Sequence, residues 1–223
     1  MKKIVIVPAA GKGIRSGFTK PKQFMKVKGK ELIVYSLETF QKNKLVDEII
    51  ISADPVYFKL LNTLKRKYGL AKITNMVEGG SKRQDSVYNA LISVSADQND
   101  LIIVHDAARP LLPQNILTSA IKTAQARGNA VVCIKGNNTL IRGKNYVEDY
   151  IHREDVFYVQ TPQIFRYRNL MKAMEKAYKE NFYGTDESML LKRIGEKVNI
   201  TGGSNFNFKV TSKEDFKLLE SLV

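Results

Sequence analysis

Apolar and polar residues follow one another in blocks along this chain, and the blocks predict strands and helices in turn. Short apolar runs rich in β-branched residues are typical of strands that are buried on both faces. Such runs predict strands at 4–7, 46–52, 73–77, 101–104 and 130–134. Segments with apolar residues three or four positions apart predict helices at 31–42, 55–67, 81–95 and 114–127. The alternation indicates an α/β fold with a doubly wound, mostly parallel sheet.

The alternation is interrupted over residues 135–160. Two turn-forming stretches, 136–138 and 143–145, are flanked by β-branched and aromatic residues, which predicts a hairpin. Its apolar side chains have no local sheet to cover them, so we expect an arm at about 136–158 that packs on a second copy of the chain. We then expect strands near Val198 and Phe208 and helices at 168–180, 186–194 and 212–222.

The length of 223 residues fits one domain, 1–223, that carries this arm. The single cysteine and two histidines predict neither a disulfide framework nor a Cys/His metal cluster. A core strand begins almost at the first residue and no apolar run approaches about 20 residues, so we expect neither a signal peptide nor a membrane span. These observations favour a cytoplasmic protein without a membrane partner.

The loop after the first predicted strand is rich in glycine and strongly cationic. Residues 8–23 contain no acid, and their basic residues are Lys12, Arg15, Lys20 and Lys22. A strand that opens into such a loop suits a polyphosphate. The dinucleotide fingerprint and the P-loop both require glycine at the position of Ser16, which argues against a nicotinamide oxidoreductase.

The formal net charge of +14 also favours polyanionic ligands. A nucleic-acid-binding module is the alternative that this charge allows. The lysines are scattered along the chain without a basic run or an RNA-binding aromatic motif. We therefore expect small-molecule substrates and no nucleic-acid partner.

Two further strand ends carry polar motifs. Residues 78–87 lie at a predicted strand-to-helix turn, where main-chain donors and Ser86 could read the edge of a base and Arg83 could meet a phosphate. A helix simply capped by Ser81 is the other interpretation. Residues 105–110 follow the strand 101–104, and ligands of open α/β sheets bind outside such strand ends. Asp106 is thus placed to hold a ribose hydroxyl or magnesium, and Arg109 to clamp a phosphate, although the two could simply pair.

These motifs together resemble the 2-C-methyl-D-erythritol 4-phosphate cytidylyltransferase family. The matching residues are Pro8-Ala9-Ala10-Gly11-x-Gly13-x-Arg15, Pro21-Lys22-Gln23, 79–87, 105–110, 160–165, 184–188 and 207–211. The resemblance implies a nucleotide-diphospho-sugar transferase-like fold and an enzyme that joins CTP to 2-C-methyl-D-erythritol 4-phosphate in isoprenoid precursor synthesis. Ribitol 5-phosphate cytidylyltransferases, which share the fold and chemistry, and a catalytically silent homologue are alternatives.

The resemblance also implies a role for each matching residue. Arg15, Lys22 and Lys209 would be catalytic and stabilise charge on the transferring phosphoryl group and the leaving pyrophosphate. CTP would be bound by Ala9, Ala10, Gly11, Gly80, Ser81, Arg83, Ser86, Asp106 and Ala107. The polyol phosphate would be bound by Asp106, Arg109, Thr139, Arg153, Thr161 and Thr185.

Two further implications concern the metal and the assembly. Asp106 would be the protein ligand of Mg²⁺, and Thr139 and Arg153 would reach the site of a neighbouring subunit in a homodimer. The chain departs from the family pattern at Asn138, where the family usually has Asp. It also lacks the acid that the family commonly has near Asn205.

Overall fold

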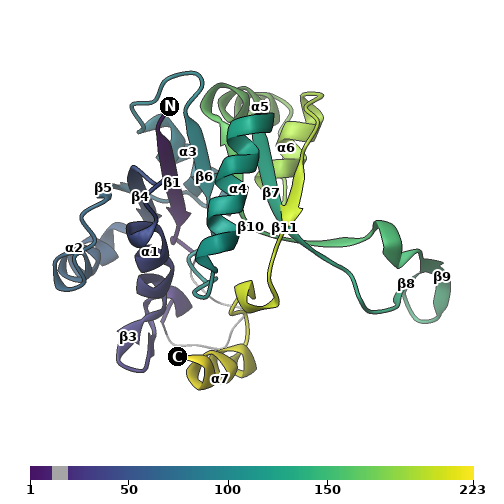
Figure 1. Ribbon diagram of the computed structural model, residues 1–223, viewed down its shortest axis with the longest axis horizontal. Helices are drawn as coiled ribbons and strands as arrows, with labels where there is room; N and C mark the ends of the chain where they lie inside the picture. Colours follow the sequence, from purple (N-terminus) through teal and green to yellow (C-terminus); the bar gives the residue numbers. More distant parts are fainter. Residues whose placement is uncertain (12–19) are drawn as a thin grey trace.

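A seven-stranded sheet forms the centre of the computed structural model, which describes residues 1–11 and 20–223 (Figure 1). The sheet has the order β11-β7-β10-β6-β1-β4-β5. Its strands are β1 (Lys3–Pro8), β4 (Glu48–Ala53), β5 (Ile73–Glu78), β6 (Leu101–Val104), β7 (Asn129–Lys135), β10 (Phe157–Arg166) and β11 (Ile200–Gly202). Neighbouring strands run parallel except at β10, which is antiparallel to β6 and β7. The predicted mostly parallel sheet is confirmed.

Helices cover both faces of the sheet. One face, with Val5 and Ile103, packs against α1 (Leu32–Lys42), α2 (Phe58–Lys67) and α4 (Gln114–Arg127). The other face, with Ile4 and Val104, packs against α3 (Arg83–Ile92), α5 (Tyr167–Lys179) and α6 (Glu187–Arg193). Because neighbouring residues of a strand point to opposite faces, a strand covered on both sides is apolar throughout, as the sequence pattern indicated. Among the described helices, none is long and apolar enough to cross a bilayer.

The C-terminal segment packs beside the carboxyl ends of the central strands. Ser212 Oγ accepts the N–H of Asp215, whose carboxylate accepts the N–H of Ser212, and this capping box begins α7 (Lys213–Leu222) as predicted. Leu219 of α7 packs in a small core with Val27, which lies in the two-stranded ribbon of β2 (Lys26–Val27) and β3 (Lys30–Glu31). Residues just before α7 are thereby held close to the strand ends.

The strand expected near Phe208 is not formed, whereas the one expected near Val198 is present as β11. Residues just before Phe208 form the short 3-10 turn η5 (Asn205–Asn207). The N–H of Val210 then donates to the carbonyl of Ala108 at 2.8 Å. The segment docks on the loop after β6 instead of extending the sheet, because its backbone finds partners in that loop.

A hairpin arm leaves the sheet between β7 and β10. At its base the N–H of Gly136 donates to the carbonyl of Val156 at 2.9 Å. Beyond this point β8 (Leu140–Gly143) and β9 (Val147–Ile151) pair with each other and project away from the sheet (Figure 1). Tyr146 and Tyr150 of the arm are 74% and 66% exposed. The predicted hairpin is confirmed, and its aromatic side chains are uncovered in the protomer.

Candidate functional site

Two predicted nucleotide-binding turns meet at the carboxyl ends of β1, β4 and β5. The N–H of Ala9 donates to Ser52 in β4 at 2.7 Å, and the N–H of Gly79 donates to Ala53 at 3.0 Å. A Cβ placed on Gly79 would lie 2.2 Å from the Cβ of Ala10. The backbone of Gly79 therefore lies against the Ala10 side chain, and only glycine allows this approach.

The second turn is closed by its own polar groups. The N–H of Gly80 donates to Ser86 Oγ at 3.1 Å, and this buried hydroxyl donates to the carbonyl of Lys82 at 3.1 Å. The exposed Ser81 donates to Asp85, which also accepts the N–H of Lys82. The Asp85 carboxylate thus caps the start of α3, which begins at Arg83, later than predicted. The turn therefore caps the start of α3, and it also holds main-chain groups in a fixed arrangement that could face a base.

The first turn is held by Gln23, for which sequence reasoning gave no role. Its buried side-chain amide donates to the carbonyl of Ala9 at 2.6 Å and to that of Gly11 at 2.9 Å. Lys22 stands beside it in the 3-10 turn η2 (Lys22–Phe24), directly after Pro21. The same short turn therefore holds the backbone of Lys22 and, through Gln23, the carbonyls of Ala9 and Gly11. The predicted catalytic residue Arg15 lies outside the described residues.

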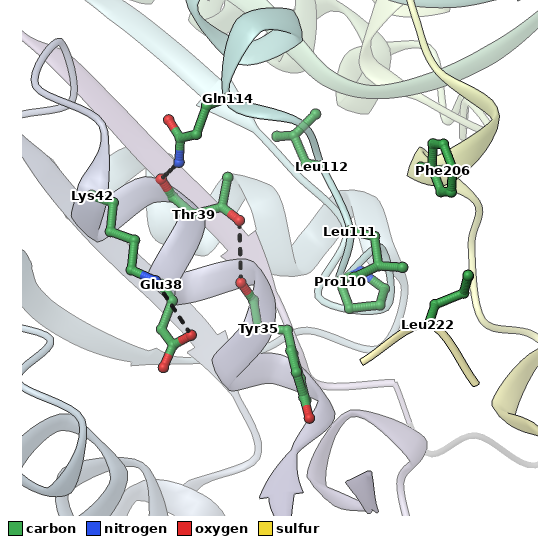
Figure 2. A pocket seen from close by; sticks show the side chains of 10 residues that line it. All are labelled: Tyr35, Glu38, Thr39, Lys42, Pro110, Leu111, Leu112, Gln114, Phe206 and Leu222. Atoms are coloured by element: carbon green, nitrogen blue, oxygen red, sulfur yellow. Dashed lines mark hydrogen bonds and ion pairs between the residues drawn. The ribbon is translucent and has the colours of Figure 1, made fainter. Parts of the chain in front are cut away.

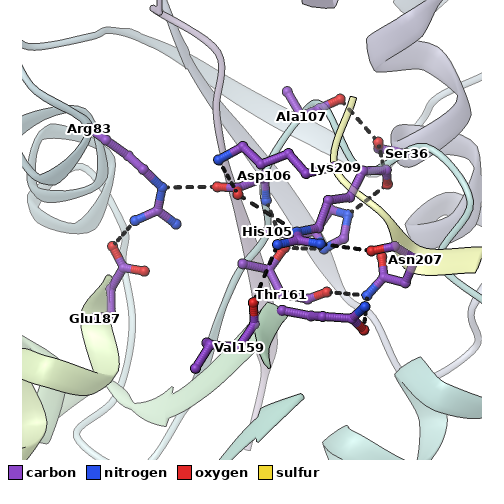
Figure 3. A network of polar contacts seen from close by, with 12 residues as sticks. Ser36, Arg83, His105, Asp106, Ala107, Val159, Thr161, Glu187, Asn207 and Lys209 are labelled. Carbon is purple, nitrogen blue, oxygen red and sulfur yellow. Dashed lines mark hydrogen bonds and ion pairs between the residues drawn. The ribbon is translucent and has the colours of Figure 1, made fainter. Parts of the chain in front are cut away.

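Asp106, just after β6, lies close to Arg83 and Lys209 (Figure 3) and also to Arg109. One carboxylate oxygen accepts Arg83 Nε at 2.9 Å, and the other lies 2.8 Å from Lys209 Nζ and 3.8 Å from Arg109 Nε. Burial alone would raise the pKa of this carboxyl, but Arg83, Lys209 and Arg109 hold it well below its usual range. The fold thus brings four predicted site residues from three motifs together, with the ionised Asp106 carboxylate at the centre.

Glu187, at the start of α6, completes this cluster. Its Oε1 lies 2.6 Å from Arg83 Nη1, so Arg83 stands between two carboxylates (Figure 3). Sequence reasoning missed Glu187, although it noted the motif 184–188; the available signal was an acid on the face that α6 buries. The resulting three cations and two carboxylates leave an excess positive charge, which suits phosphate groups.

Buried His105 ties the loop after β6 to β10. Its Nε2 lies 3.0 Å from the carbonyl of Arg109, which can only accept, so this nitrogen carries the hydrogen. Its Nδ1 accepts the hydroxyl of Thr161 at 3.0 Å, and Thr161 Oγ1 in turn accepts the N–H of Asp106. A neutral imidazole therefore positions the backbone on both sides of the cluster.

This arrangement predicts a loss of stability in mild acid. Burial lowers the pKa of His105 from 6.5 to about 4. Because the folded state resists protonation that the unfolded chain accepts, the stabilisation is complete above about pH 6.5 and is lost as the pH falls towards 4. We expect the free energy of unfolding to decrease by on the order of 3 kcal/mol over this range from His105 alone. Denaturant unfolding at several pH values measures it.

The matched control for this prediction is His105→Gln, which keeps a polar side chain but cannot titrate. It should show a shallower dependence of unfolding free energy on pH than the wild type. Equal slopes for His105→Gln and the wild type would contradict the prediction.

The remaining predicted substrate residues differ in their surroundings. The Arg109 guanidinium donates to the carbonyl of Asn207 at 2.7 Å and more weakly to that of Val159. The hydroxyl of Thr161 is buried and engaged as described above, and the exposed Thr185 donates to a methionine sulfur. Buried Ala107 accepts a hydrogen bond from Ser36 through its carbonyl. The contacts of Arg109, Thr161 and Ala107 hold the loop around Asp106 in place.

Two predicted substrate residues lie in the arm. Thr139 directly precedes β8, and Arg153 begins the 3-10 turn η4 (Arg153–Asp155) after β9; both are exposed. The arm carries them away from the sheet (Figure 1). A single protomer therefore does not gather all the predicted residues.

The donor set around Asp106 is compatible with one divalent cation. Among the described residues, no group of three or more His, Cys, Asp and Glu side chains could hold a metal ion. Mg²⁺, however, is commonly bound by one or two carboxylates together with substrate phosphates and water. Asp106 is an ionised carboxylate just after a strand end, but its two oxygens contact Arg83 and Lys209. It therefore fits this mode only together with substrate phosphates, whose negative charge offsets that of the surrounding cations.

A separate cavity of about 460 Å³ lies between α1, η5 and the end of the loop 105–112 (Figure 2). It mixes the apolar side chains of Leu111, Leu112 and Phe206 with the ion pair of Glu38 and Lys42. None of the predicted site residues that the structure describes lines it. We therefore place the candidate site at the Asp106 cluster.

Known proteins with similar sequences and structures show which family this chain belongs to. Proteins of Clostridium botulinum (strain Langeland) and Clostridioides difficile, both named 2-C-methyl-D-erythritol 4-phosphate cytidylyltransferase, are each 37% identical to this chain. The matches cover 100% and 98% of this chain and 97% and 92% of the relatives.

Solved structures of proteins with the same name also match. The Francisella tularensis protein has a TM-score of 0.85 at 29% identity, covering 100% of both chains. The Thermus thermophilus protein has a TM-score of 0.82 at 28% identity, covering 100% of this chain and 98% of its own. The family profile described as "2-C-methyl-D-erythritol 4-phosphate cytidylyltransferase" matches residues 3–223. Because the profile covers nearly the whole chain and full-length relatives are 37% identical to it, this chain belongs to the 2-C-methyl-D-erythritol 4-phosphate cytidylyltransferase family.

Proposed function

We propose that this chain transfers the cytidylyl group of CTP to 2-C-methyl-D-erythritol 4-phosphate. The products are 4-diphosphocytidyl-2-C-methyl-D-erythritol and pyrophosphate, in isoprenoid precursor synthesis. The observation that carries the proposal is the meeting of Asp106, Arg83, Arg109 and Lys209 beside the two touching main-chain turns. Family membership supplies the identity of the two substrates.

In the proposed reaction, a phosphate oxygen of the polyol substrate attacks the α-phosphorus of CTP. A new phosphorus–oxygen bond forms, the bond to the β-phosphate breaks, and pyrophosphate leaves with the electron pair. A phosphate nucleophile needs no general base, so the protein contributes positioning and charge stabilisation. Arg15, Lys22 and Lys209 are the proposed catalytic residues, and Arg109, Thr161 and Thr185 help to place the polyol phosphate.

Asp106 is the residue that would hold Mg²⁺, with the remaining ligands supplied by phosphates and water. The bound ion would neutralise charge on the triphosphate. The chain's own part is to keep the carboxylate ionised at that place, through Arg83 and Lys209.

The base of CTP is proposed to lie against the paired turns. Main-chain groups of Ala9, Ala10 and Gly80, with Ser81 and Ser86, can read its amino edge, and a site built this way rejects a mismatched base. Release of pyrophosphate, measured with each of the four nucleoside triphosphates against methylerythritol and ribitol phosphates, tests the proposal. We expect turnover only with CTP and a clear preference for methylerythritol phosphate. Equal use of UTP, or preference for ribitol phosphate, would contradict it.

The contact between Gly79 and Ala10 makes a further prediction. The methyl group of Gly79→Ala would overlap the Ala10 side chain and push the two turns apart. Overpacking typically costs about 1–3 kcal/mol, so we expect CTP binding to weaken roughly tenfold or more. Calorimetric titration with CTP measures this effect. Gly202→Ala is the control, since nothing lies within 4 Å of the added Cβ, and it should bind CTP normally. Normal binding by Gly79→Ala would show that the turns do not form the base site.

We also propose a cytoplasmic homodimer in which each arm completes the partner's site. The exposed aromatic residues of the arm support a covering surface on a second chain, and Thr139 and Arg153 would then meet the partner's substrate. The single, free and buried Cys133 is compatible with a reducing compartment.

Subunit mixing tests the shared site. Arg153→Ala and Lys22→Ala chains are each expected to be nearly inactive alone. In a mixed dimer one of the two sites has both residues intact, so activity should partly return. The mixed species should be isolated with two affinity tags before the assay. A verified mixed dimer without recovered activity would rule out a site shared in this way.

A further inference from the structure

The carboxylate of Glu187 has an unusual environment for a group outside the predicted site. The residue is 1% exposed, and its only ion pair among the described residues is with Arg83. Its second oxygen, Oε2, is buried without a hydrogen-bond partner among the described residues. Leaving a carboxylate oxygen buried and unpaired is costly, so this side chain is a poor choice for stability alone.

Arg83 connects this carboxylate to the centre of the site. Its Nε donates to Asp106 at 2.9 Å and its Nη1 to Glu187 at 2.6 Å, and the guanidinium is therefore fixed from two sides (Figure 3). With Asp106 as its only partner, the guanidinium could rotate about a single hydrogen bond. A planar group held by two carboxylates keeps one orientation.

Hydrogen bonds of the neighbouring residue Gln84 and of Gln163 also join α3 and β10 to the distant segment 182–188. Gln84, next to Arg83, accepts the N–H of Gly184 at 2.9 Å and donates to the carbonyl of Phe182 at 3.2 Å. On the other side, Gln163 of β10 accepts the N–H of Ser188 at 3.0 Å. These neutral contacts already anchor the start of α6. The charge of Glu187 is thus not needed to hold the segment.

From these observations we infer that Glu187 is a positioning residue, which acts through Arg83 to hold the Asp106 carboxylate in its orientation for the nucleotide. This inference rests on the proposed function, because it assumes that Asp106 takes part in binding CTP. A misplaced site group typically costs up to about 100-fold in rate, and we expect Glu187→Gln to lower kcat/KM for CTP roughly 10- to 100-fold. The KM for the polyol phosphate should stay near its wild-type value.

A double-mutant cycle tests the inference. Arg83→Gln, Glu187→Gln and the double variant are compared by calorimetric CTP binding, by steady-state kinetics and by melting temperature. If Glu187 acts through Arg83, the double variant should be no weaker than Arg83→Gln alone. The melting temperature of Glu187→Gln should stay within about 2 °C of the wild type. Glu180→Gln is the matched control, since it removes a surface ion pair with Arg193 and should leave every readout unchanged.

Each outcome decides one question. If the losses caused by the two single substitutions multiply in the double variant, Glu187 does not act through Arg83. If the melting temperature falls in parallel with the activity, Glu187 has a structural role. Wild-type affinity and kinetics in Glu187→Gln would also overturn the inference and leave the proposed function intact. A wild-type chain that neither binds CTP nor releases pyrophosphate would overturn both.

Discussion

Lys22→Ala should slow turnover by roughly 100- to 1000-fold while the KM for CTP changes far less. Pro21 and the turn η2 fix the backbone of Lys22 next to Gln23, which donates to the carbonyls of Ala9 and Gly11. The α-phosphoryl group and the leaving pyrophosphate gain negative charge in the transition state. A cation aimed there therefore lowers the barrier more than it strengthens binding. Steady-state kinetics with both substrates varied separate the two effects.

A conservative variant and a control variant test this interpretation of Lys22. Lys22→Arg should restore only part of the rate, because a planar guanidinium does not replace a compact ammonium group. Lys44→Ala, at an exposed lysine after α1, should behave as the wild type. If Lys22→Ala kept its turnover number and only raised the KM for CTP, Lys22 would serve binding and not the chemical step. Arg109→Ala should differ from it by also raising the KM for the polyol phosphate.

Asp106→Asn should combine a loss of activity of roughly 1000-fold with a clear loss of stability. The amide would leave Arg83, Lys209 and Arg109 close together with Glu187 as the remaining counter-charge. Breaking a buried ion pair from one side costs about 3–5 kcal/mol, and we expect about 3 here because Lys209 reaches solvent. Thermal unfolding should therefore shift downwards by roughly 10 °C.

A second substitution tests the explanation of the stability loss. Adding Lys209→Met to Asp106→Asn removes one of the crowded cations, so the melting temperature should partly recover. The activity should stay low, because Lys209 is itself a proposed catalytic residue. Glu48→Gln, which breaks the surface ion pair with Lys2, is the control and should change neither property. A melting temperature that does not recover in the double variant would contradict the explanation by crowded charge.

The inner strand β10 shows where local sequence patterns fail. Its buried part contains Gln160, Thr161 and Gln163, which interrupt the apolar run that identifies the other strands. Gln160 bonds to Ser204, Thr161 to His105, and Gln163 to Ser188. Polar residues can be buried where such partners exist, and partners this distant in sequence cannot be recognised from a local pattern.

The candidate site also contains some residues that the sequence could predict and others that it could not. The main-chain turns and Asp106 could be predicted because they directly follow apolar strands, and the carboxyl ends of parallel strands meet at one edge. The pairing of Arg83 with Glu187 could not, since the two residues are brought together by α3 and α6 packing on the same face of the sheet. The supporting roles of Gln23 and His105 depend equally on partners in other segments.

The sequence by itself determined the parallel α/β core, the hairpin and the family, because apolar periodicity and short motifs are local properties of the chain. Only the tertiary structure decided that the loop after β6 receives Lys209 in place of a further strand near Phe208, and that Asp106 lies among three cations. The physical reason is that charges and hydrogen-bonding groups act on whatever the packed core brings within a few ångströms of them. That proximity is set by the whole fold.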